Sequence, residues 1–502
     1  MKKINFLFLI LCCALSPLRG QENAWTPLNE QAQKYLADLV AINTAMPQPQ
    51  ELKAVRYIYK EFNKHHIDWD VFVPIKGRAN LLARLKGTDP AQKPLLLISH
   101  LDTVAPSEGW TLPPFKATEK DGRIYGLGTT DAKNYTAIYL TLFTWLARYS
   151  QPPKRDIIFL ATSGEEAGSE PGLRWLEDTH WAQIAPGYAL NEGGGIIRSE
   201  DGTNLVFAEA STKMYMDIKI TARGTEGHSA VPVNDNAVYA LSEALAKIAA
   251  YDPPAKLNAT SRAFFTSILP LQDEDGQTTI RLLLDGAPNL QQAAAQVMAQ
   301  DPFFRSQLKD TLSPTLLSAT SQEANATSAE ASALINVRLL PNSEPDELFE
   351  NLKDLFKDNP QITLEIVERP QLPFPKPMDG QDALFASIQK TAQKLWPGAI
   401  TVPGLSPASG DNEFLRRLGV ITYGLGPEMD PLNGSSSHAS DEFINKDDFL
   451  RQLQFTAGII FDFAYGEDLL PFPELSVTQT PQTDLVTSNE QGENYDKSQK
   501  NN

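Results

Sequence analysis

The stretch Pro94-Leu-Leu-Leu-Ile-Ser-His-Leu-Asp-Thr-Val104 predicts the fold class of the chain. Its apolar run, residues 95–98, is typical of a strand that is buried on both faces of a parallel sheet. Ligands bind beyond the carboxyl ends of such strands. Because residues two apart on a strand share a face, His100 and Asp102 should point into that crevice together. An imidazole beside a carboxylate suits a metal ligand, and it equally suits a strand-end histidine beside a turn aspartate.

The length and charge of the chain limit its organisation and its partners. With 502 residues, of which 42% are hydrophobic, the chain exceeds what one compact core usually holds, so two domains are expected. The formal net charge is −18 and does not favour nucleic acid or an anionic membrane surface as a partner. No run beyond the N-terminal segment reaches the ~18 apolar residues that a membrane span needs.

The two ends of the chain have the composition of non-core segments. Lys2 and Lys3 precede an apolar run over residues 4–15, and the small residue Gly20 ends the segment, which predicts a secretory signal peptide over residues 1–20 and a secreted or periplasmic protein. Both cysteines lie inside that segment, so a metal in the mature chain would be held by His, Asp and Glu. The polar residues 467–502 predict a disordered tail.

Acidic residues repeatedly follow the predicted buried strands. Asp131 precedes a helix predicted over residues 137–149, where a helix N-cap is the simple explanation. Glu165 and Glu166 follow a strand predicted at 156–161, and adjacent carboxylates repel unless a cation or a shared proton relieves them. Glu192 occupies a third such position. This placement is hard to assign to surface chemistry.

A change of pattern near residue 212 indicates a second, inserted domain. The order is a strand at 214–222, a helix at 237–250 and an irregular insert with a helical stretch at 291–308. A strand that ends with residues 336–341, a helix at 346–356 and a strand at 362–367 follow. Such a β-α-β order predicts a small ferredoxin-like α+β domain over 212–375. The α/β pattern resumes afterwards with a helix at 383–395. We therefore expect a catalytic domain over 21–211 and 376–466, with the insert as a lid.

Together, several motifs resemble those of the M20 metallopeptidase family, which includes glutamate carboxypeptidase, aminoacylase, dipeptidase and desuccinylase types. They are His100-Leu-Asp102, Gly128-Thr-Thr-Asp131, Glu165-Glu166, Glu192-Gly-Gly, Gly227-His228-Ser, Val337-Arg338-Leu and His438-Ala-Ser-Asp-Glu442. The resemblance extends from Leu28 to about Tyr465. It implies a zinc exopeptidase type of fold, in which helices cover a mixed, largely parallel sheet.

The resemblance also implies a site with two metal ions, usually Zn²⁺, for which Co²⁺ or Mn²⁺ can substitute. His100 and Glu192 would bind one ion, His438 and Glu166 the other, and Asp131 would bridge them. Glu165 would be the general base, and Asp102 would orient His100. A cis peptide bond is expected at Asp131–Ala132. On the lid, His228 would polarise the scissile carbonyl, often across a homodimer, while Arg338 and Asn325 would bind substrate.

The predicted function is that of a secreted metal-dependent exopeptidase, which hydrolyses the amide bond next to a C-terminal amino acid. An N-acyl amino acid amidohydrolase is the alternative with the same machinery, and a non-catalytic binding protein is a more distant one. The substrate would be a small peptide or an N-acyl amino acid. One departure concerns specificity, because Glu413 stands where some relatives have arginine. The sequence has neither a Gly-x-Ser-x-Gly elbow nor a His-Glu-x-x-His helix.

Overall fold

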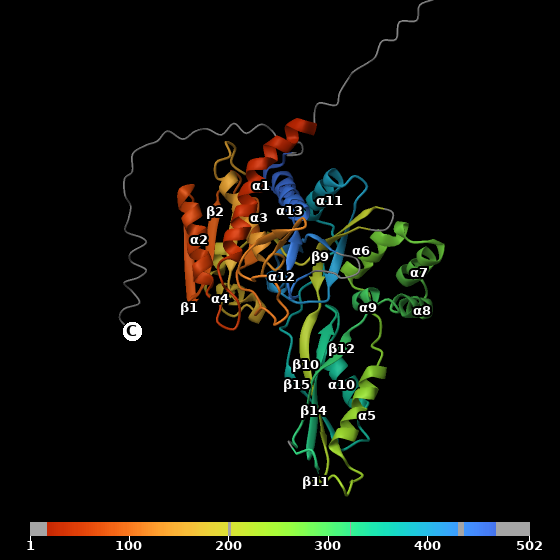
Figure 1. Ribbon diagram of the computed structural model, residues 1–502. Helices are drawn as coiled ribbons and strands as arrows, with labels where there is room; N and C mark the ends of the chain where they lie inside the picture. Colours follow the sequence, from red (N-terminus) through yellow and green to blue (C-terminus); the bar gives the residue numbers. More distant parts are fainter. Residues whose placement is uncertain (1–17, 199–201, 322, 430–435, 468–502) are drawn as a thin grey trace, which may run out of the picture.

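The computed structural model describes residues 18–198, 202–321, 323–429 and 436–467 (Figure 1). Its largest sheet has the order β1-β2-β6-β3-β7-β17-β9-β8-β18, and β16 pairs with β9. β3 pairs in parallel with β6 and β7, as β17 does with β7 and β16 with β9. The strands are β1 (Trp69–Ile75), β2 (Arg78–Leu85), β3 (Leu95–His100), β6 (Ile157–Thr162), β7 (Tyr188–Asn191), β8 (Gly195–Arg198), β9 (Asn204–Thr212), β16 (Ile400–Ser406), β17 (Ile421–Gly424) and β18 (Glu428–Met429).

Helices cover both faces of this sheet, which explains why β3 has an unbroken apolar run. Leu95 and Leu97 pack in the core that includes α1 (Leu18–Val40), α2 (Glu51–Lys64), α3 (Lys133–Leu146), α11 (Ala383–Leu395) and α13 (Lys446–Ile460). Leu96 and Ile98 pack in a core on the other face, with α4 (Leu173–Ile184) and α12 (Asp411–Arg417). The expected mixed, largely parallel α/β sheet is thereby confirmed.

The lid has the expected ferredoxin-like arrangement. Its antiparallel sheet has the order β12-β14-β10-β15, formed by β10 (Met214–Arg223), β12 (Thr311–Ala319), β14 (Glu330–Leu339) and β15 (Ile362–Glu368). Figure 1 shows this sheet projecting from the large sheet beyond β9, with α5 (Ala237–Ala250) and α10 (Pro345–Asp354) beside it. Alternate residues of β14 are buried, because one face of the sheet packs on these helices.

The insert between α5 and β12 packs mainly on the large sheet. It consists of α6 (Ala259–Ile268), α7 (Glu274–Asp285), α8 (Pro288–Met298) and α9 (Pro302–Leu308). Phe264 and Phe265 share a core with Phe207 of β9 and Val402 of β16. The rings of Phe207 and Phe264 meet edge to face at 6.3 Å. Contacts of this segment therefore cross the predicted boundary at residue 212.

A buried lysine joins the two units where β9 continues into β10. The Nζ atom of Lys213 donates hydrogen bonds to the main-chain oxygen of Lys309 at 2.7 Å and to Oγ1 of Thr311 at 3.2 Å. Because Lys213 is fully buried, these bonds replace its lost hydration and tie the two strands that lead into the lid.

The predicted signal peptide and polar tail fall largely outside the described residues, apart from the first residues of α1 and Glu467. Over the described residues, no helix has the length and apolar character that crossing a membrane requires. Two small sheets complete the fold. One has the order β19-β5-β4, formed by β4 (Thr118–Lys120), β5 (Arg123–Tyr125) and β19 (Phe443–Asn445), and the other pairs β11 (Gly227–His228) with β13 (Ala326–Thr327).

Candidate metal centre

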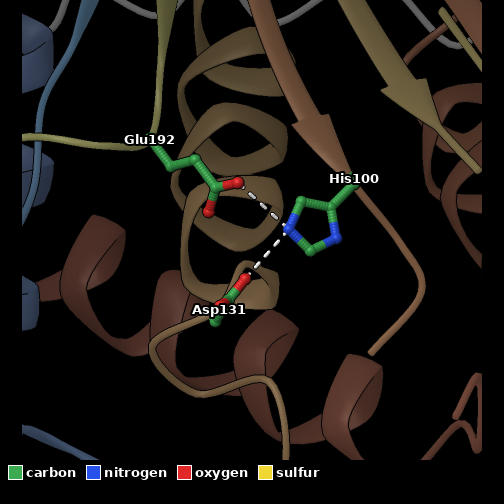
Figure 2. Close-up of side chains that lie close together, drawn as sticks. All are labelled: His100, Asp131 and Glu192. Atoms are coloured by element: carbon green, nitrogen blue, oxygen red, sulfur yellow. Dashed lines mark hydrogen bonds and ion pairs between the residues drawn. The ribbon is translucent and has the colours of Figure 1, made fainter. Parts of the chain in front are cut away.

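The carboxyl end of β3 presents His100 to two carboxylates. The imidazole Nε2 lies 3.0 Å from Oδ1 of Asp131 and 3.1 Å from Oε1 of Glu192 (Figure 2). Asp131 comes from the loop before α3, and Glu192 directly follows β7. Since β7 is the parallel neighbour of β3, the two strands deliver their terminal side chains to the same crevice, as the sequence pattern predicted.

A second histidine lies on the other oxygen of the same aspartate. The Nε2 atom of His438 is 3.2 Å from Oδ2 of Asp131 and 3.1 Å from Oε2 of Glu166. Within each of the two groups, the potential ligand atoms lie within 4.8 Å of one another. Imidazole nitrogens and carboxylate oxygens are ordinary Zn²⁺ ligands, so the donor set fits two ions that share Asp131.

The protonation of these groups also fits a cation site. The hydrogen bonds with Asp131 and Glu166 raise the pKa of His438 to about 10. Burial raises the pKa of Asp131, but hydrogen bonds from His100 and His438 outweigh this effect and lower it. Burial raises the pKa of Glu192 to about 7. The carboxylates therefore hold positive charge on the imidazole nitrogens, where a bound metal ion would replace the proton.

Asp102 contacts both His100 and the turn that carries the paired glutamates. The Nδ1 atom of His100 lies 3.0 Å from the main-chain oxygen of Asp102, whereas the carboxylate Oδ1 is 3.7 Å away. The carboxylate instead accepts hydrogen bonds from the main-chain N–H groups of Gly164, Glu165 and Glu166 at 2.8, 3.2 and 3.2 Å. Asp102 thus orients His100 through its backbone, and its side chain shapes the glutamate turn.

Glu165 belongs to neither ligand group. Its Oε1 atom lies 2.7 Å from the position that a Cβ would take at Gly410, so a larger residue there would displace the carboxylate. Burial raises its pKa well above the usual value, and the charges of Glu192 and Asp411 add to this effect. A half-buried carboxylate with a raised proton affinity, beside the candidate ligand Glu166, has the properties of a proton acceptor.

Glu442 is a site residue to which sequence reasoning gave no role. Its side chain is 1% exposed, and its carboxylate accepts three main-chain hydrogen bonds, from Gly128 at 2.9 Å, Thr130 at 2.7 Å and Asp131 at 3.1 Å. It thereby fastens the loop of Asp131 to the segment of His438. The signal available in the sequence was an acid close behind the last histidine of the motif.

A buried network supports Glu192. The Nδ2 atom of Asn412 donates to the main-chain oxygen of Glu192 at 2.8 Å and to Oε1 of Glu209 at 2.9 Å. Nη1 of Arg416 lies 2.9 Å from the same Glu209 oxygen. Gly193 has a φ of +118°, and a Cβ there would lie 2.0 Å from Oε2 of Glu209, so glycine is required at this turn.

The ligands open into a cavity of about 620 Å³. Arg338 from the lid lies beside it, because its Nη1 donates a hydrogen bond of 3.0 Å to Oγ of Ser409, which lines the cavity. The guanidinium also lies 4.9 Å from the centroid of the Tyr215 ring. The lining residues are Arg123, Thr130, Asp131, Tyr135, Glu165, Glu166, Asn191, Glu192, Gly193, Gly194, Glu209, Thr212, Ser406, Ala408, Ser409, Gly410, Asp411, Asn412, Pro427, Glu428, Ser436, Ser437, His438, Phe443, Ile444 and Asn445.

The structure does not bring every predicted site residue to this cavity. His228 is exposed, and Figure 1 places β11 at the end of the lid farthest from β9. Asn325 lies next to His228, since its main-chain oxygen accepts a hydrogen bond of 2.8 Å from Ser229. The alternative that Asp131 is a simple cap is wrong, because Ala132 occupies the N-cap position of α3. The expected cis peptide bond at Asp131–Ala132 is confirmed.

Comparisons with known proteins agree with this geometry. The sequence model of peptidase family M20/M25/M40 matches residues 96–462. Mouse N-fatty-acyl-amino acid synthase/hydrolase PM20D1 is 25% identical over 404 residues, 78% of each chain. A probable succinyl-diaminopimelate desuccinylase of Staphylococcus aureus strain MSSA476 is 28% identical over 431 residues, 83% of this chain and 94% of that protein.

Solved structures share the fold. An M20 family metallo-carboxypeptidase, Sso-CP2 from Sulfolobus solfataricus, has a TM-score of 0.62 at 17% identity and covers 86% of this chain and 98% of its own. Human carnosine dipeptidase 1 has a TM-score of 0.61 at 15% identity, with coverage of 88% and 99%. At these identities the likeness concerns the fold.

The Glu442 contacts generate a prediction about metal affinity. In Glu442→Gln, the amide NH₂ group must face a main-chain N–H, so the loop of Asp131 loses an acceptor. We expect metal affinity to fall roughly 10- to 100-fold, as for other groups that hold ligands in place. Competition with a chromophoric chelator measures this. Glu61→Gln, which alters a buried glutamate outside the cavity lining, is the control. Unchanged affinity with only a lower melting temperature would contradict the assigned role.

Proposed function

The chain belongs to peptidase family M20/M25/M40, and from this we propose that it is a metal-dependent hydrolase of the amide bond next to an amino acid with a free α-carboxylate. The observation that carries the proposal is Asp131, whose two oxygens each lie within 3.2 Å of a different histidine. That arrangement suits two ions held by His100 with Glu192 and by His438 with Glu166. Zn²⁺ is the proposed metal, with Co²⁺ or Mn²⁺ as substitutes.

The residues around the centre have separate proposed roles. Two bound ions would lower the pKa of a shared water and so supply a nucleophile near neutral pH. Glu165 would take the proton of this water and deliver it to the leaving nitrogen. Its neighbour Glu166 faces His438, so the paired glutamates divide into a base and a ligand.

Arg338 is the proposed receptor of the α-carboxylate. A carboxylate leaves water at low cost only if a cation receives it, and the Arg338 guanidinium reaches the cavity through Ser409. Glu413, where some relatives have arginine, is 8% exposed and is not among the described residues that line the cavity. Burial raises the pKa of Glu413 to about 7, and the positive charges of Arg417 and Arg338 oppose this rise.

Two kinds of acyl half are compatible with this machinery. An exopeptidase would accept a peptidyl group, and an N-acyl amino acid amidohydrolase would accept a simple acyl group. The names of the mouse and staphylococcal relatives favour the second. A non-catalytic binding protein is disfavoured, because each proposed ligand and Glu165 are present. We also propose, from residues 1–20, that the mature enzyme is secreted or periplasmic.

The position of His228 favours a homodimer. Since His228 and Asn325 lie at the far end of the lid, they could act only at the site of a second copy or after a large closure. The edge strand β12 exposes Leu316 (64%) and Leu317 (69%), which supports an interface on the lid.

The first prediction of the proposed function distinguishes the role of the metal from that of the general base Glu165. A panel of N-acyl amino acids and dipeptides, assayed with added zinc, cobalt or manganese, should reveal turnover that a chelator abolishes. Glu165→Gln keeps the size of the side chain but removes the base, so kcat should fall roughly 10²–10⁴-fold while bound metal stays unchanged. Glu166→Gln, by contrast, should lose metal. If Glu165→Gln kept the wild-type rate, Glu165 would not be the general base, and the division of roles between Glu165 and Glu166 would be wrong.

The second prediction tests the carboxylate receptor. Arg338→Ala should raise KM for substrates with a free α-carboxylate, because truncating one partner of such a pair typically costs ~2–5 kcal/mol. The matched substrate has an amidated C-terminus, on which the variant should lose far less. Equal losses on the acid and the amide would show that Arg338 does not bind the carboxylate.

The third prediction concerns His228. His228→Ala should lower kcat without changing bound metal, since no ligand is removed. If His228 acts across a dimer, co-expression of His228→Ala with Glu165→Gln should restore activity, because each mixed dimer has one site with both groups intact. Persistent inactivity of the mixture, together with a monomeric mass in solution, would favour closure within one chain instead.

A further inference from the structure

We propose that Arg123 and Phe443 form a subsite for a carboxylate on the acyl half of the substrate, separate from the Arg338 subsite. The enzyme would then prefer acyl groups that carry a second negative charge. This inference rests on the proposed function and specifies its substrate class.

Arg123 is held in place by a sheet at the edge of the metal-binding cavity. It begins β5, where it pairs with Asn445 of β19. Its guanidinium carbon lies 4.1 Å from the centroid of the Phe443 ring, which is stacking distance. Arg123, Phe443 and Asn445 all line the cavity. The side chain is thus positioned by a neighbouring strand and an aromatic face.

The side chain of Arg123 is exposed, and among the described residues none forms a hydrogen bond or ion pair with its guanidinium, which contacts the Phe443 ring. Among the described lining residues, it is the one lysine or arginine. The same cavity is lined by the carboxylates of Asp131, Glu165, Glu166, Glu192, Glu209, Asp411 and Glu428. An acid-rich cavity repels an anionic acyl group unless a cation receives it, and the planar fork of arginine binds a carboxylate through two hydrogen bonds.

Arg123 and Arg338 contact different residues of the cavity lining. Arg338 contacts Ser409, which precedes the glycine packed against Glu165. Arg123 stacks on Phe443, whose main-chain oxygen accepts a hydrogen bond of 2.8 Å from Thr130, the neighbour of Asp131. An amide bond placed at the centre, with its α-carboxylate on Arg338, can therefore direct its acyl half toward Arg123.

The test compares kcat/KM on two matched pairs of substrates that share the best leaving amino acid found in the panel. One pair has N-succinyl and N-butyryl groups. The other has N-acetyl-aspartyl and N-acetyl-asparaginyl groups. The wild-type enzyme should prefer the charged member of at least one pair, and the pair concerned identifies a dicarboxylic acyl group or an acidic peptide residue as the source of the carboxylate.

Arg123→Ala should reduce the ratio of charged to neutral kcat/KM by about 5- to 50-fold, between the effect of a solvated ion pair and that of charge-assisted hydrogen bonds. Arg123→Lys should keep part of the preference. Lys120→Ala removes an equal charge from the residue paired with Arg123 on β4, outside the cavity lining, and should leave the ratio unchanged.

Added salt should weaken the preference of the wild-type enzyme more than that of Arg123→Ala. Absence of a wild-type preference in both pairs, or an equal loss on charged and neutral members in Arg123→Ala, would overturn the subsite. Hydrolysis of the neutral substrates would then still support the proposed function, so the two failures are distinguishable.

Discussion

Asp131 directs one carboxylate oxygen to His100 and the other to His438. These histidines belong to the end of β3 and to the segment before β19. Asp131 can therefore contact both of them only when these two parts of the large unit have packed together. The pairing of β5 with β19 and the hydrogen bond from Thr130 to Phe443 hold them in register. Geometry at the centre therefore depends on the closure of the whole large sheet and its helices.

A second layer of buried acids holds the turns that carry the candidate metal ligands. Asp102 accepts main-chain hydrogen bonds from the glutamate turn, and Glu442 accepts them from the loop of Asp131. Glu209 acts through Asn412 and Arg416 on the turn after Glu192. Buried polar groups persist when each has partners, and such networks hold loops rigidly. The positions of the candidate ligands are thus supported by hydrogen bonds to the turns that carry them, which is the condition for a well-defined metal site.

The lid contributes differently at its two ends. At the end nearer the large sheet, Arg338 on β14 contacts Ser409 of the large unit, and buried Lys213 ties the strands that connect the units. At the far end, the two-stranded sheet of β11 and β13 carries His228 away from the centre. The proposed binding of substrate by Arg338 would consequently depend on the angle of the lid, whereas the candidate metal ligands all belong to the large unit.

Local patterns in the sequence determined where the main helices and strands lie and which of them the candidate site residues follow. The two-sided burial of β3 and the bounds of α5 and α11 followed from hydrophobic periodicity, which depends on neighbours in the chain. Tertiary structure alone decided four other features. These are the hydrogen-bond partners of the Asp102 side chain, the hydrogen bonds of Glu442 with the loop of Asp131, the packing of α6 on β16 and the distance of His228 from the centre. Each of these features depends on segments that are far apart in sequence and meet in space. Hydrogen bonds from main-chain N–H groups are also hard to predict from sequence, because almost every residue type has the same main-chain donor.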